Sequence, residues 1–387
     1  MSKANKSRAL GYLKVLGDNA TIVSDGTVYD SVEYIDTGCY LLNAQLSNTI
    51  YGGIRSNKIT GLAGEESTGK TFLLLGLVKN YLEMNKDAMV VFFESEGAVD
   101  KYTFESRGID TTRVILKTVE SVEDLRHRST VFLNAYKADT TKDRPKIMMC
   151  LDSLGMLPSD KESDDAQEGK NKADMTRAKV IKSLFRIITI KLALANIPLI
   201  FTNHVYDVMD QYSLPEFSGG KGSKFSASTL LYLAKSNFKD TDAQTHAEEH
   251  SGITVTSHTV KSRDTRQKTK VKFVIHVKHG LDKFSGMFEF CKDFGLLEKI
   301  GNRYFWASEG DDDPKYKKAI LADPASFFTK SRLDDVDATC REYFGYGDAL
   351  DDKADLKDEL SITEAIELDK GSKPPRPKKS KSEKSKK

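Results

Sequence analysis

The sequence predicts an α/β fold: a three-layer core with a mainly parallel sheet, antiparallel strands at its edge and helices on both faces. Three short apolar runs, residues 88–93, 147–151 and 197–202, are bounded by charged residues, proline or glycine. Continuous apolar runs of this length are typical of strands buried on both faces of a parallel sheet. A helical pattern from about 172 to 195 precedes the third run. Alternation of helix and strand favours the parallel core.

The periodicity changes after residues 230–233. Residues 253–261 and 270–278 alternate between polar and apolar side chains, and the polar segment 262–269 separates them. A period of two residues is typical of half-buried strands. We therefore expect these two segments to be antiparallel strands added to the edge of the sheet.

Composition divides the chain into four segments. The predicted segments are an N-terminal arm for oligomerisation (1–35), the core (36–282), a small and mostly helical C-terminal domain (283–350) and a disordered tail (351–387). Residues 334–369 carry 13 acidic and 3 basic side chains, a net charge of 3 − 13 = −10, and residues 371–387 carry 8 basic and 1 acidic, a net of 8 − 1 = +7. The basic end has no large apolar residue with which to fold alone. It is either a solvated tail or an arm that binds nucleic acid or a partner protein.

The overall composition is that of a soluble globular protein, with 39% hydrophobic and 30% charged residues and a net charge of +2. No run of about 18 uncharged apolar residues occurs, which argues against a membrane span. No apolar segment follows the charged start at 1–8, which argues against a secretory signal. The cysteines are far apart and form no C-x-x-C pair, as expected for buried thiols in a reducing cytoplasm. We expect a cytoplasmic protein with no membrane partner.

Residues 64–71 match the phosphate-binding pattern G-x-x-x-x-G-K-[ST] at every fixed position. A predicted strand at 58–62 precedes them, and a predicted helix at 72–82 directs its positive dipole end at the phosphates. Lys70 supplies charge to the β- and γ-phosphates, and the Thr71 hydroxyl is a ligand for Mg²⁺. The predicted residues of this nucleoside triphosphate site are Gly64, Glu65, Glu66, Ser67, Thr68, Gly69, Lys70 and Thr71.

Polar side chains follow each of the three apolar runs. Asp152 follows the second run, the usual setting for a carboxylate that orients Mg²⁺. Glu94 and Glu96 follow the first run, and because they are two residues apart they can point the same way. One of the two would orient and deprotonate the attacking water. His204 follows the third run, where a polar side chain can touch the γ-phosphate and relay its presence into the next loop.

Two long polar loops are candidates for contact with DNA. Residues 205–224 combine glycines with aromatic and lysine side chains, which suits stacking and phosphate contacts with single-stranded nucleic acid. Residues 155–174 form a second loop that is acidic at 160–168 and basic at its flank. The predicted DNA-binding residues are Lys170, Lys172, Arg177, Lys179, Tyr206, Gly219, Gly220, Lys221 and Lys224.

A zinc-peptidase pattern needs to be set aside. Residues 246–250 read His-Ala-Glu-Glu-His and fit H-x-x-E-H. Such a site requires a stable helix that presents both histidines. The pattern here lies in a polar stretch between two predicted strands, so we expect a hairpin tip and no zinc.

Over about 52–306 the chain resembles the RecA/Rad51 recombinase family. The phosphate loop alone is shared with many ATPases, whereas the helix after the first polar loop is more specific. The stretches that carry the resemblance are the phosphate loop, 92–96, 151–155, 174–179, 182–187, 203–204 and 260–263.

The resemblance implies roles for individual residues. Glu96 would be the catalytic base and Asp152 the acid that orients Mg²⁺. His204 would take the sensor position that many relatives fill with glutamine. Lys261 and Arg263 would reach the ATP of the neighbouring subunit, so that ATP joins one subunit to the next.

The sequence departs from the family in two places. Relatives carry an adenine-stacking tyrosine seven residues after the catalytic glutamate, and here that position is Thr103. Tyr102 and Phe104 flank it, and we assign the contact with adenine to Tyr102. The tail of the family is typically acidic, whereas this one turns basic after Gly371.

The resemblance implies a DNA-dependent ATPase that uses ATP and Mg²⁺. Such a protein polymerises on single-stranded DNA and drives homologous pairing and strand exchange with double-stranded DNA. Its expected partners are further copies of itself, a single-strand-binding protein and a loading mediator. The alternatives are a ring-shaped helicase on the same core, for which the roughly 50 residues before the phosphate loop leave little room for a collar domain, and a recombinase paralogue that acts as a mediator or scaffold.

Overall fold

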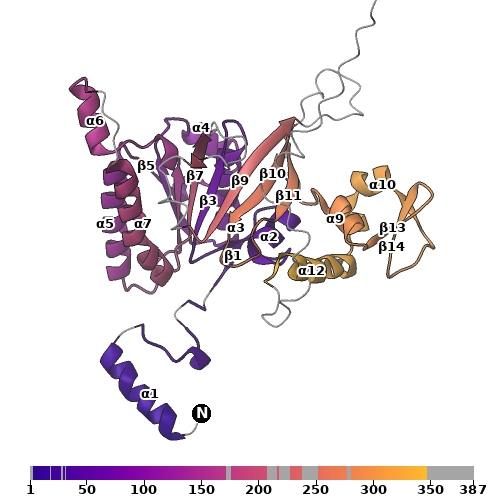
Figure 1. Cartoon of the computed structure of the whole chain (residues 1–387), viewed down its shortest axis with the longest axis horizontal. Coiled ribbons are helices and arrows are strands. Elements are labelled where there is room, and N and C mark those ends of the chain that lie inside the picture. Colours follow the sequence, from indigo (N-terminus) through magenta and orange to yellow (C-terminus); the bar gives the residue numbers. More distant parts are fainter. Residues whose placement is uncertain are drawn as a thin grey trace, which may run out of the picture.

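A ten-stranded sheet forms the centre of the molecule (Figure 1). The computed structural model describes residues 3–17, 19–27, 29–30, 32–170, 176–206, 216–217, 227–237, 252–276 and 280–346. The strands follow the order β12-β11-β10-β9-β3-β7-β6-β4-β5, and β8 pairs with β7. Their bounds are β3 Ile59–Gly64, β4 Met89–Glu94, β5 Val114–Thr118, β6 Ile147–Asp152, β7 Leu199–Tyr206, β8 Glu216–Phe217, β9 Thr229–Asn237, β10 Gly252–Lys261, β11 Lys270–His276 and β12 Gly280–Leu281.

The directions of the strands confirm the predicted fold class. From β9 to β5, each strand on this path is parallel to its neighbour. β10, β11 and β12 are antiparallel to one another and to β9, so they form an antiparallel extension at one end of the sheet. The three apolar runs are the strands β4, β6 and β7.

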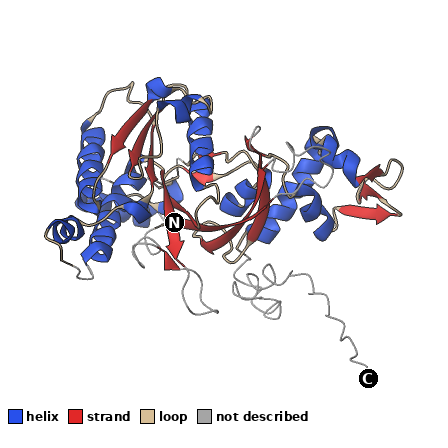
Figure 2. Ribbon diagram, turned by 90° about the horizontal axis from the view of Figure 1, so that it is seen from above, coloured by secondary structure: helices blue, strands red, loops and turns tan. Residues whose placement is uncertain are grey.

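Helices cover both faces of the parallel strands (Figures 1 and 2). Alternate residues of β4 belong to different hydrophobic clusters: Val90 and Phe92 pack with the helix after the phosphate loop, and Val91 and Phe93 pack with two helices on the other face. This alternation follows from the two-residue period of a strand and gives the core three layers. These helices are α3 Lys70–Met84 on one face and α5 Val122–Ala138 and α7 Thr176–Ala195 on the other.

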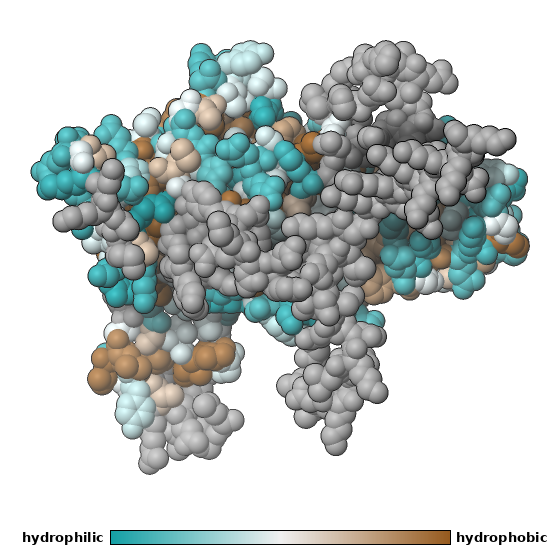
Figure 3. All heavy atoms as spheres, turned by 45° about the horizontal axis from the view of Figure 1, so that its top comes forward, coloured by the Kyte–Doolittle hydropathy of each residue, from teal (hydrophilic) through white to brown (hydrophobic). Residues whose placement is uncertain are grey.

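The N-terminal helix stands away from the rest of the molecule (Figure 1). Hydrophobic atoms gather on this arm in Figure 3, and its side chains Tyr12, Val15 and Leu16 are between 68% and 85% exposed. Exposed apolar side chains in a group are typical of a surface that another chain covers. The arm elements and the first core elements are α1 Lys3–Leu16, η1 Val23–Asp25, β1 Tyr34–Ile35, α2 Tyr40–Ser47 and β2 Ile54–Arg55.

The segment after β6 contains more structure than the single long loop that we predicted. It forms η3 (Leu154–Met156) and then α6 (Asp160–Gln167). The Ser159 side chain caps this helix by accepting a hydrogen bond from the N–H of Glu162, and acidic residues in the first turn favour the positive end of the helix. Residues 171–175, with Lys172, lie outside the described part of the chain.

The region after residue 283 is also less helical than predicted. Its elements are α9 Met287–Asp293, β13 Leu297–Ile300, β14 Arg303–Trp306, β15 Lys315–Tyr316, α10 Lys317–Ala322, α11 Pro324–Phe327 and α12 Lys330–Phe344. Ile300 pairs with Arg303, so a two-residue turn joins β13 to β14. Gly301 has a φ of 60°, the positive value that such hairpin turns need.

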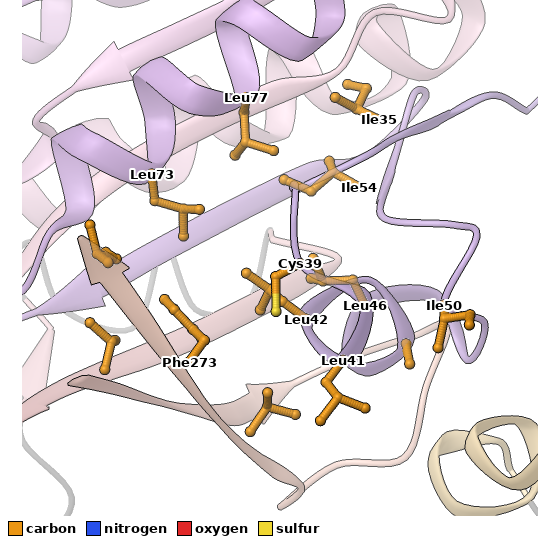
Figure 4. Packing of buried hydrophobic residues seen from close by; sticks show 14 of the residues in the cluster. Ile35, Cys39, Leu41, Leu42, Leu46, Ile50, Ile54, Leu73, Leu77 and Phe273 are labelled. Carbon is orange, nitrogen blue, oxygen red and sulfur yellow. The ribbon is translucent and has the colours of Figure 1, made fainter. Parts of the chain in front are cut away.

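The C-terminal region packs directly on the core. Phe344 of α12 belongs to the same hydrophobic cluster as Leu42 of α2 and Leu73 of α3. Figure 4 shows Leu73 and Leu77 pointing from α3 toward Leu42 and its neighbours. The four buried cysteines are free thiols, as predicted. The domain boundary near residue 283 stays a prediction, because hydrophobic contacts continue across it.

One buried carboxylate fixes α12 to α2. Asp337 is 8% exposed and accepts hydrogen bonds from Thr49 Oγ1 (2.5 Å), Ile50 N (2.8 Å) and Arg341 Nε (2.8 Å). The Asp337 carboxylate thus satisfies the hydrogen-bonding needs of all three donor groups around it. The carboxylate therefore links the C-terminal helix to the end of α2.

We expect Asp337→Ala to destabilise the protein by about 2 kcal/mol, since it leaves the buried N–H of Ile50 without its partner. Urea unfolding followed by circular dichroism measures this change. The matched control is Asp334→Ala on the same helix, which removes only an exposed contact with Lys330 and Tyr51. Equal unfolding midpoints for the two variants would contradict the role of Asp337.

Candidate active site

The phosphate loop lies between the carboxyl end of β3 and the first turn of α3. Ser67 and Gly69 have positive φ values of 56° and 83°. Such residues alternate the direction of the backbone so that N–H groups face a common centre, which is a concave site for anions. A side chain on Gly69 would also meet the terminal methyl group of Ile275 at 2.8 Å, which would have to shift.

Lys70 is held over the loop by backbone carbonyls. Its Nζ donates to Gly64 O at 2.9 Å and to Glu65 O at 2.6 Å. Burial lowers the pKa of the ammonium group, and the nearby carboxylates of Glu96 and Asp152 oppose that shift. A buried cation bonded to two neutral oxygens gains electrostatically when phosphate oxygens replace them.

Asp152 joins three elements at the carboxyl edge of the sheet. Its Oδ2 accepts a hydrogen bond from Thr71 Oγ1 of α3 at 2.7 Å, and its Oδ1 accepts one from Thr202 Oγ1 of β7. The residue is 4% exposed. Burial raises the pKa of the carboxyl group, although the bonds from Thr202 and Thr71 oppose the rise.

The pair formed by Thr71 and Asp152 fits a magnesium ion. Mg²⁺ prefers oxygen ligands and is usually held by one or two protein groups together with water and phosphate. A divalent cation also favours the ionised form of a buried carboxylate. Among the described residues, no cluster of three or more histidine, cysteine or carboxylate side chains could hold a metal alone.

The structure separates the two glutamates that the sequence leaves equivalent. Glu94 is buried, and its Oε1 accepts hydrogen bonds from the backbone N–H groups of Glu96 (2.9 Å) and Ala98 (3.0 Å). The Glu96 side chain instead faces the site, where its Oε1 lies 3.0 Å from His204 Nε2. Glu94 therefore shapes the loop, and Glu96 is the carboxylate available for chemistry.

Several groups keep Glu96 ionised. Burial alone raises its pKa, but Ser153 and His204 as hydrogen-bonding neighbours, with the charges of His204 and Lys70, hold the pKa below its ordinary value. A carboxylate with a lowered pKa is deprotonated at neutral pH, the state that a general base requires.

The register of the sheet brings His204 beside the phosphate loop. In the parallel pair of β3 and β7, Gly64 lies opposite His204. On its other side the histidine touches η3, because a side chain on Gly155 would lie 2.9 Å from His204 Cδ2 and 3.1 Å from Asn203 Oδ1. His204 thus lies between Glu96 and the first residues of the loop that was predicted to face DNA.

The helix α4 (Lys101–Glu105) carries the candidates for contact with the base. Thr103 is engaged with Asp100 in a capping box, and Phe104 is buried against Phe92 at a centroid distance of 5.4 Å. Tyr102 is 75% exposed. Of the three, only Tyr102 has a ring on the surface, and its assignment to adenine stays a prediction.

Lys261 and Arg263 lie far from the phosphate loop of their own chain. Lys261 ends β10, which lies between β9 and β11 in the antiparallel extension of the sheet. β10 runs antiparallel to β9, and Lys261 pairs with Leu230, which in turn pairs with Gly61 of β3. The turn that carries Arg263 therefore continues toward the amino end of β3, whereas the phosphate loop follows its carboxyl end.

The predicted DNA-binding residues have different surroundings. The Arg177 guanidinium donates to the carbonyls of Leu157 (2.6 Å), Leu154 (3.1 Å) and Gly155 (2.9 Å), so it supports the loop after β6 from within. Lys170 forms an ion pair with Glu168, and Lys179 is exposed on α7. Those outside the described part of the chain, or described there only in their backbone, are Lys172, Tyr206, Gly219, Gly220, Lys221 and Lys224, and the pattern at 246–250 also lies outside it.

Sequence reasoning missed two residues that shape the site, Thr202 and Gly155, and assigned a third, Arg177, to contact with DNA. Thr202 bonds Asp152, Gly155 admits His204, and Arg177 holds the carbonyls of η3. A threonine at the end of an apolar strand beside a predicted metal site was a signal for the first. The roles of Gly155 and Arg177 depend on contacts between distant segments and left no local pattern.

The phosphate loop, the buried Asp152 and the polar residues near the end of β7 lie along one edge of a parallel sheet. This arrangement defines an α/β nucleotide-binding protein of the phosphate-loop class. Residues 8–282 match the family described as the RecA N-terminal domain. The chain belongs to this family.

Two kinds of relative illustrate the match. The chain is 32% identical over 277 residues to the "Recombination and repair protein" of Enterobacteria phage T4, which covers 72% of this chain and 68% of the relative. It is 24% identical over 322 residues to "Protein RecA" of Aquifex aeolicus, covering 81% and 85%, and 23% identical over 310 residues to "Protein RecA" of Chlorobium chlorochromatii, covering 79% and 82%. Within the described ranges, no helix is both long enough and apolar enough to span a bilayer.

Gly155→Ala should slow triphosphate hydrolysis by at least about tenfold and leave nucleotide binding nearly unchanged, since the new methyl group displaces His204 from Glu96. Steady-state hydrolysis and titration with a fluorescent nucleotide measure the two effects. The control is Gly76→Ala in α3, where a methyl group meets nothing within 4 Å. Wild-type turnover in Gly155→Ala would show that the position of His204 is not critical.

Proposed function

We propose that this chain is an ATP-dependent DNA recombinase that assembles on single-stranded DNA and drives homologous pairing and strand exchange in recombination and repair. Membership of the RecA family supports the proposal, as does similarity to relatives named "Recombination and repair protein" and "Protein RecA". The observation that carries it is the position of Arg263, in a turn directed toward the amino end of β3 and away from its own phosphate loop.

The proposed ATPase step follows from the groups around the loop. The backbone N–H groups of 65–69 bind the phosphates, and Lys70 balances the charge that develops on the transferring group. Glu96 removes the proton from the attacking water while His204 holds the carboxylate in place. Thr71 and Asp152 would hold Mg²⁺, which would supply positive charge against the phosphate oxygens.

A complete site on this proposal contains residues from two subunits. Arg263 is exposed and its turn is directed away from its own phosphate loop, so on this proposal it meets the triphosphate of another copy. A contact between opposite ends of identical molecules is heterologous, and it forms an open helix where the rotation does not close. The exposed apolar face of α1 supplies a second surface for the same assembly.

We propose that DNA runs past the carboxyl edge of the sheet. Lys170 and Lys179 are described basic side chains in the chain that follows β6 at this edge, and the segment 205–224 continues directly from His204. Phosphate contacts of this kind bind DNA without reading its sequence. His204 touches both Glu96 and the loop after β6, and this arrangement supports coupling between hydrolysis and DNA binding.

The reaction on DNA needs no covalent chemistry from the protein, and hydrolysis would reset the filament. Homologous double-stranded DNA, a single-strand-binding protein and a loading mediator are the proposed partners. Because the substrates are DNA, we propose action in the cytoplasm, that of the host cell if the protein is of phage origin. A helicase ring or a mediator without turnover is less favoured by the family match and by the intact set of Lys70, Thr71, Glu96 and Asp152.

Glu96→Gln should lower the rate of ATP hydrolysis by about 10²- to 10⁴-fold with little effect on ATP binding, as expected for loss of a positioned base. Glu94→Gln is the matched control, since its oxygen serves backbone N–H groups. A larger loss of rate in Glu94→Gln than in Glu96→Gln would reverse the assignment.

The pH dependence checks the same assignment. The rate falls at acid pH when the base takes up a proton, and His204 lowers the pKa of Glu96. In His204→Gln the pKa of Glu96 rises toward its ordinary value, so the acid limb of the pH–rate profile should move to higher pH. An unmoved limb would mean that another group is the base.

Replacing Lys261 and Arg263 together by alanine should leave the unfolding midpoint unchanged while DNA-stimulated hydrolysis and filament growth fail together. Adding Lys70→Ala protein should restore part of the hydrolysis, because the double mutant keeps its phosphate loop and Lys70→Ala keeps both cations. Electron microscopy with single-stranded DNA and a hydrolysis assay at several mixing ratios measure these effects. No recovery at any ratio would exclude action of the two residues in trans.

A further inference from the structure

The turn that carries Arg263 is fixed from several directions. Residues 262–269 join β10 to β11, and a β-bulge between Thr259 and Lys261 precedes them. Ser262, between the two cations, is 2% exposed, whereas Arg263 is exposed to solvent. The chain therefore turns one side chain inward and the next outward at the point where the proposed trans site begins.

The Ser262 hydroxyl closes this turn. Its Oγ accepts hydrogen bonds from the backbone N–H groups of Asp264 (3.2 Å) and Thr265 (2.9 Å). The Thr265 hydroxyl lies 2.9 Å from the same oxygen and 2.8 Å from the carbonyl of Gln45. A serine that binds the following N–H groups sets the direction of the chain over two residues, here those on either side of Arg263.

A buried polar network lies beneath the turn. Gln45 of α2 is fully buried, and its Nε2 donates to Ser257 O (3.1 Å) and Thr269 O (3.2 Å), while its Oε1 accepts from Ser257 Oγ (2.6 Å). Arg55 pairs with Asp264 at 2.5 Å on the outer side. The buried Gln45 amide uses both its donors and its acceptor, so a displacement of the turn would leave a buried polar group unpaired.

The end of the C-terminal helix completes the enclosure. The Tyr346 hydroxyl donates to Ser262 O at 2.9 Å, and the N–H of Arg266 donates to Phe344 O at 2.8 Å. Tyr346 is 58% exposed, so its ring contributes little to the core, and its hydroxyl bonds to the residue between the two cations. This bond joins residues 84 positions apart.

We propose that Ser262 and Tyr346 are positioning residues that hold Arg263, and with it Lys261, toward the triphosphate of the next subunit. The inference rests on the proposed function, since it assumes that the two cations act in trans. The C-terminal region is then part of the active site of a neighbouring molecule, through a contact that touches neither nucleotide nor DNA.

Tyr346→Phe tests the inference with the smallest change, since it removes one hydroxyl and keeps the ring. Loss of one hydrogen bond should lower DNA-stimulated ATP hydrolysis about fivefold. Binding of a fluorescent ATP analogue to the unassembled protein and the unfolding midpoint should stay near wild type. Tyr343→Phe, which removes a hydroxyl from the last turn of α12, three residues before Tyr346, is the matched control and should keep the wild-type rate. Ser262→Ala should lower the rate further, since its oxygen accepts from two backbone N–H groups and also bonds the Thr265 hydroxyl.

Mixing experiments separate positioning in trans from a structural role. In an equal mixture with Lys70→Ala protein, each Tyr346→Phe protomer keeps an intact phosphate loop. Half of these phosphate loops face a Lys70→Ala neighbour, in which Tyr346 still holds the turn that carries Arg263. The rate for each Tyr346→Phe protomer should then rise about threefold. A structural defect confined to the mutant protomer would show no such rise.

The outcomes also distinguish a failure of the positioning role of Tyr346 from a failure of the proposed trans site. Recovery of the Lys261 and Arg263 double mutant by Lys70→Ala, without recovery of Tyr346→Phe, would overturn the positioning role alone. Failure of both mixtures would overturn the trans site and the inference together. A wild-type rate for Tyr346→Phe alone would also overturn the positioning role.

Discussion

The buried carboxylate of Asp152 is the interaction on which the site depends. It accepts from Thr71 at the start of α3 and from Thr202 near the end of β7, while its own strand, β6, pairs with β4 so that Asp152 lies opposite Glu94. A shift of one residue in any of these parallel pairs would turn the side chains to the opposite face of the sheet. The same register that buries the core therefore brings the phosphate loop, the carboxylates and His204 to one edge.

Much of this arrangement follows from the sequence, and the exceptions have physical causes. The strands β4, β6 and β7 were predictable because burial on both faces leaves an unbroken apolar run. The edge strand β5 was not predicted, since Ile115 and Leu116 are both about half exposed and give no regular pattern. The roles of Glu94 and Glu96 depend on which carboxylate turns toward backbone N–H groups, a choice that spacing does not encode. Only the folded structure distinguishes the roles of the two glutamates.

Helix α2 connects parts of the molecule that the sequence presents as separate. Its middle residue Gln45 binds the turn between β10 and β11, and just beyond its end Thr49 and Ile50 bind Asp337 of α12. Eight residues thus join the sheet extension to the C-terminal region. Nothing in its composition predicts this role, because each contact depends on a partner more than 200 positions away. Motifs locate the chemistry of this chain, but long-range polar contacts decide how its segments work together.

The position of Arg263 and the phosphate loop at opposite ends of one sheet has a consequence for any assembly that uses both. A row of such molecules ends in an unused phosphate loop on one side and in unused cations on the other, so its two ends differ chemically. Nucleotide held by the terminal loop lacks its second set of ligands and exchanges with solvent as it does on a free molecule. Turnover would then be slowest at that terminus, and growth and shortening would proceed at different speeds from the two ends. The row would have a direction set by the fold of each molecule, before any polarity of the DNA is considered.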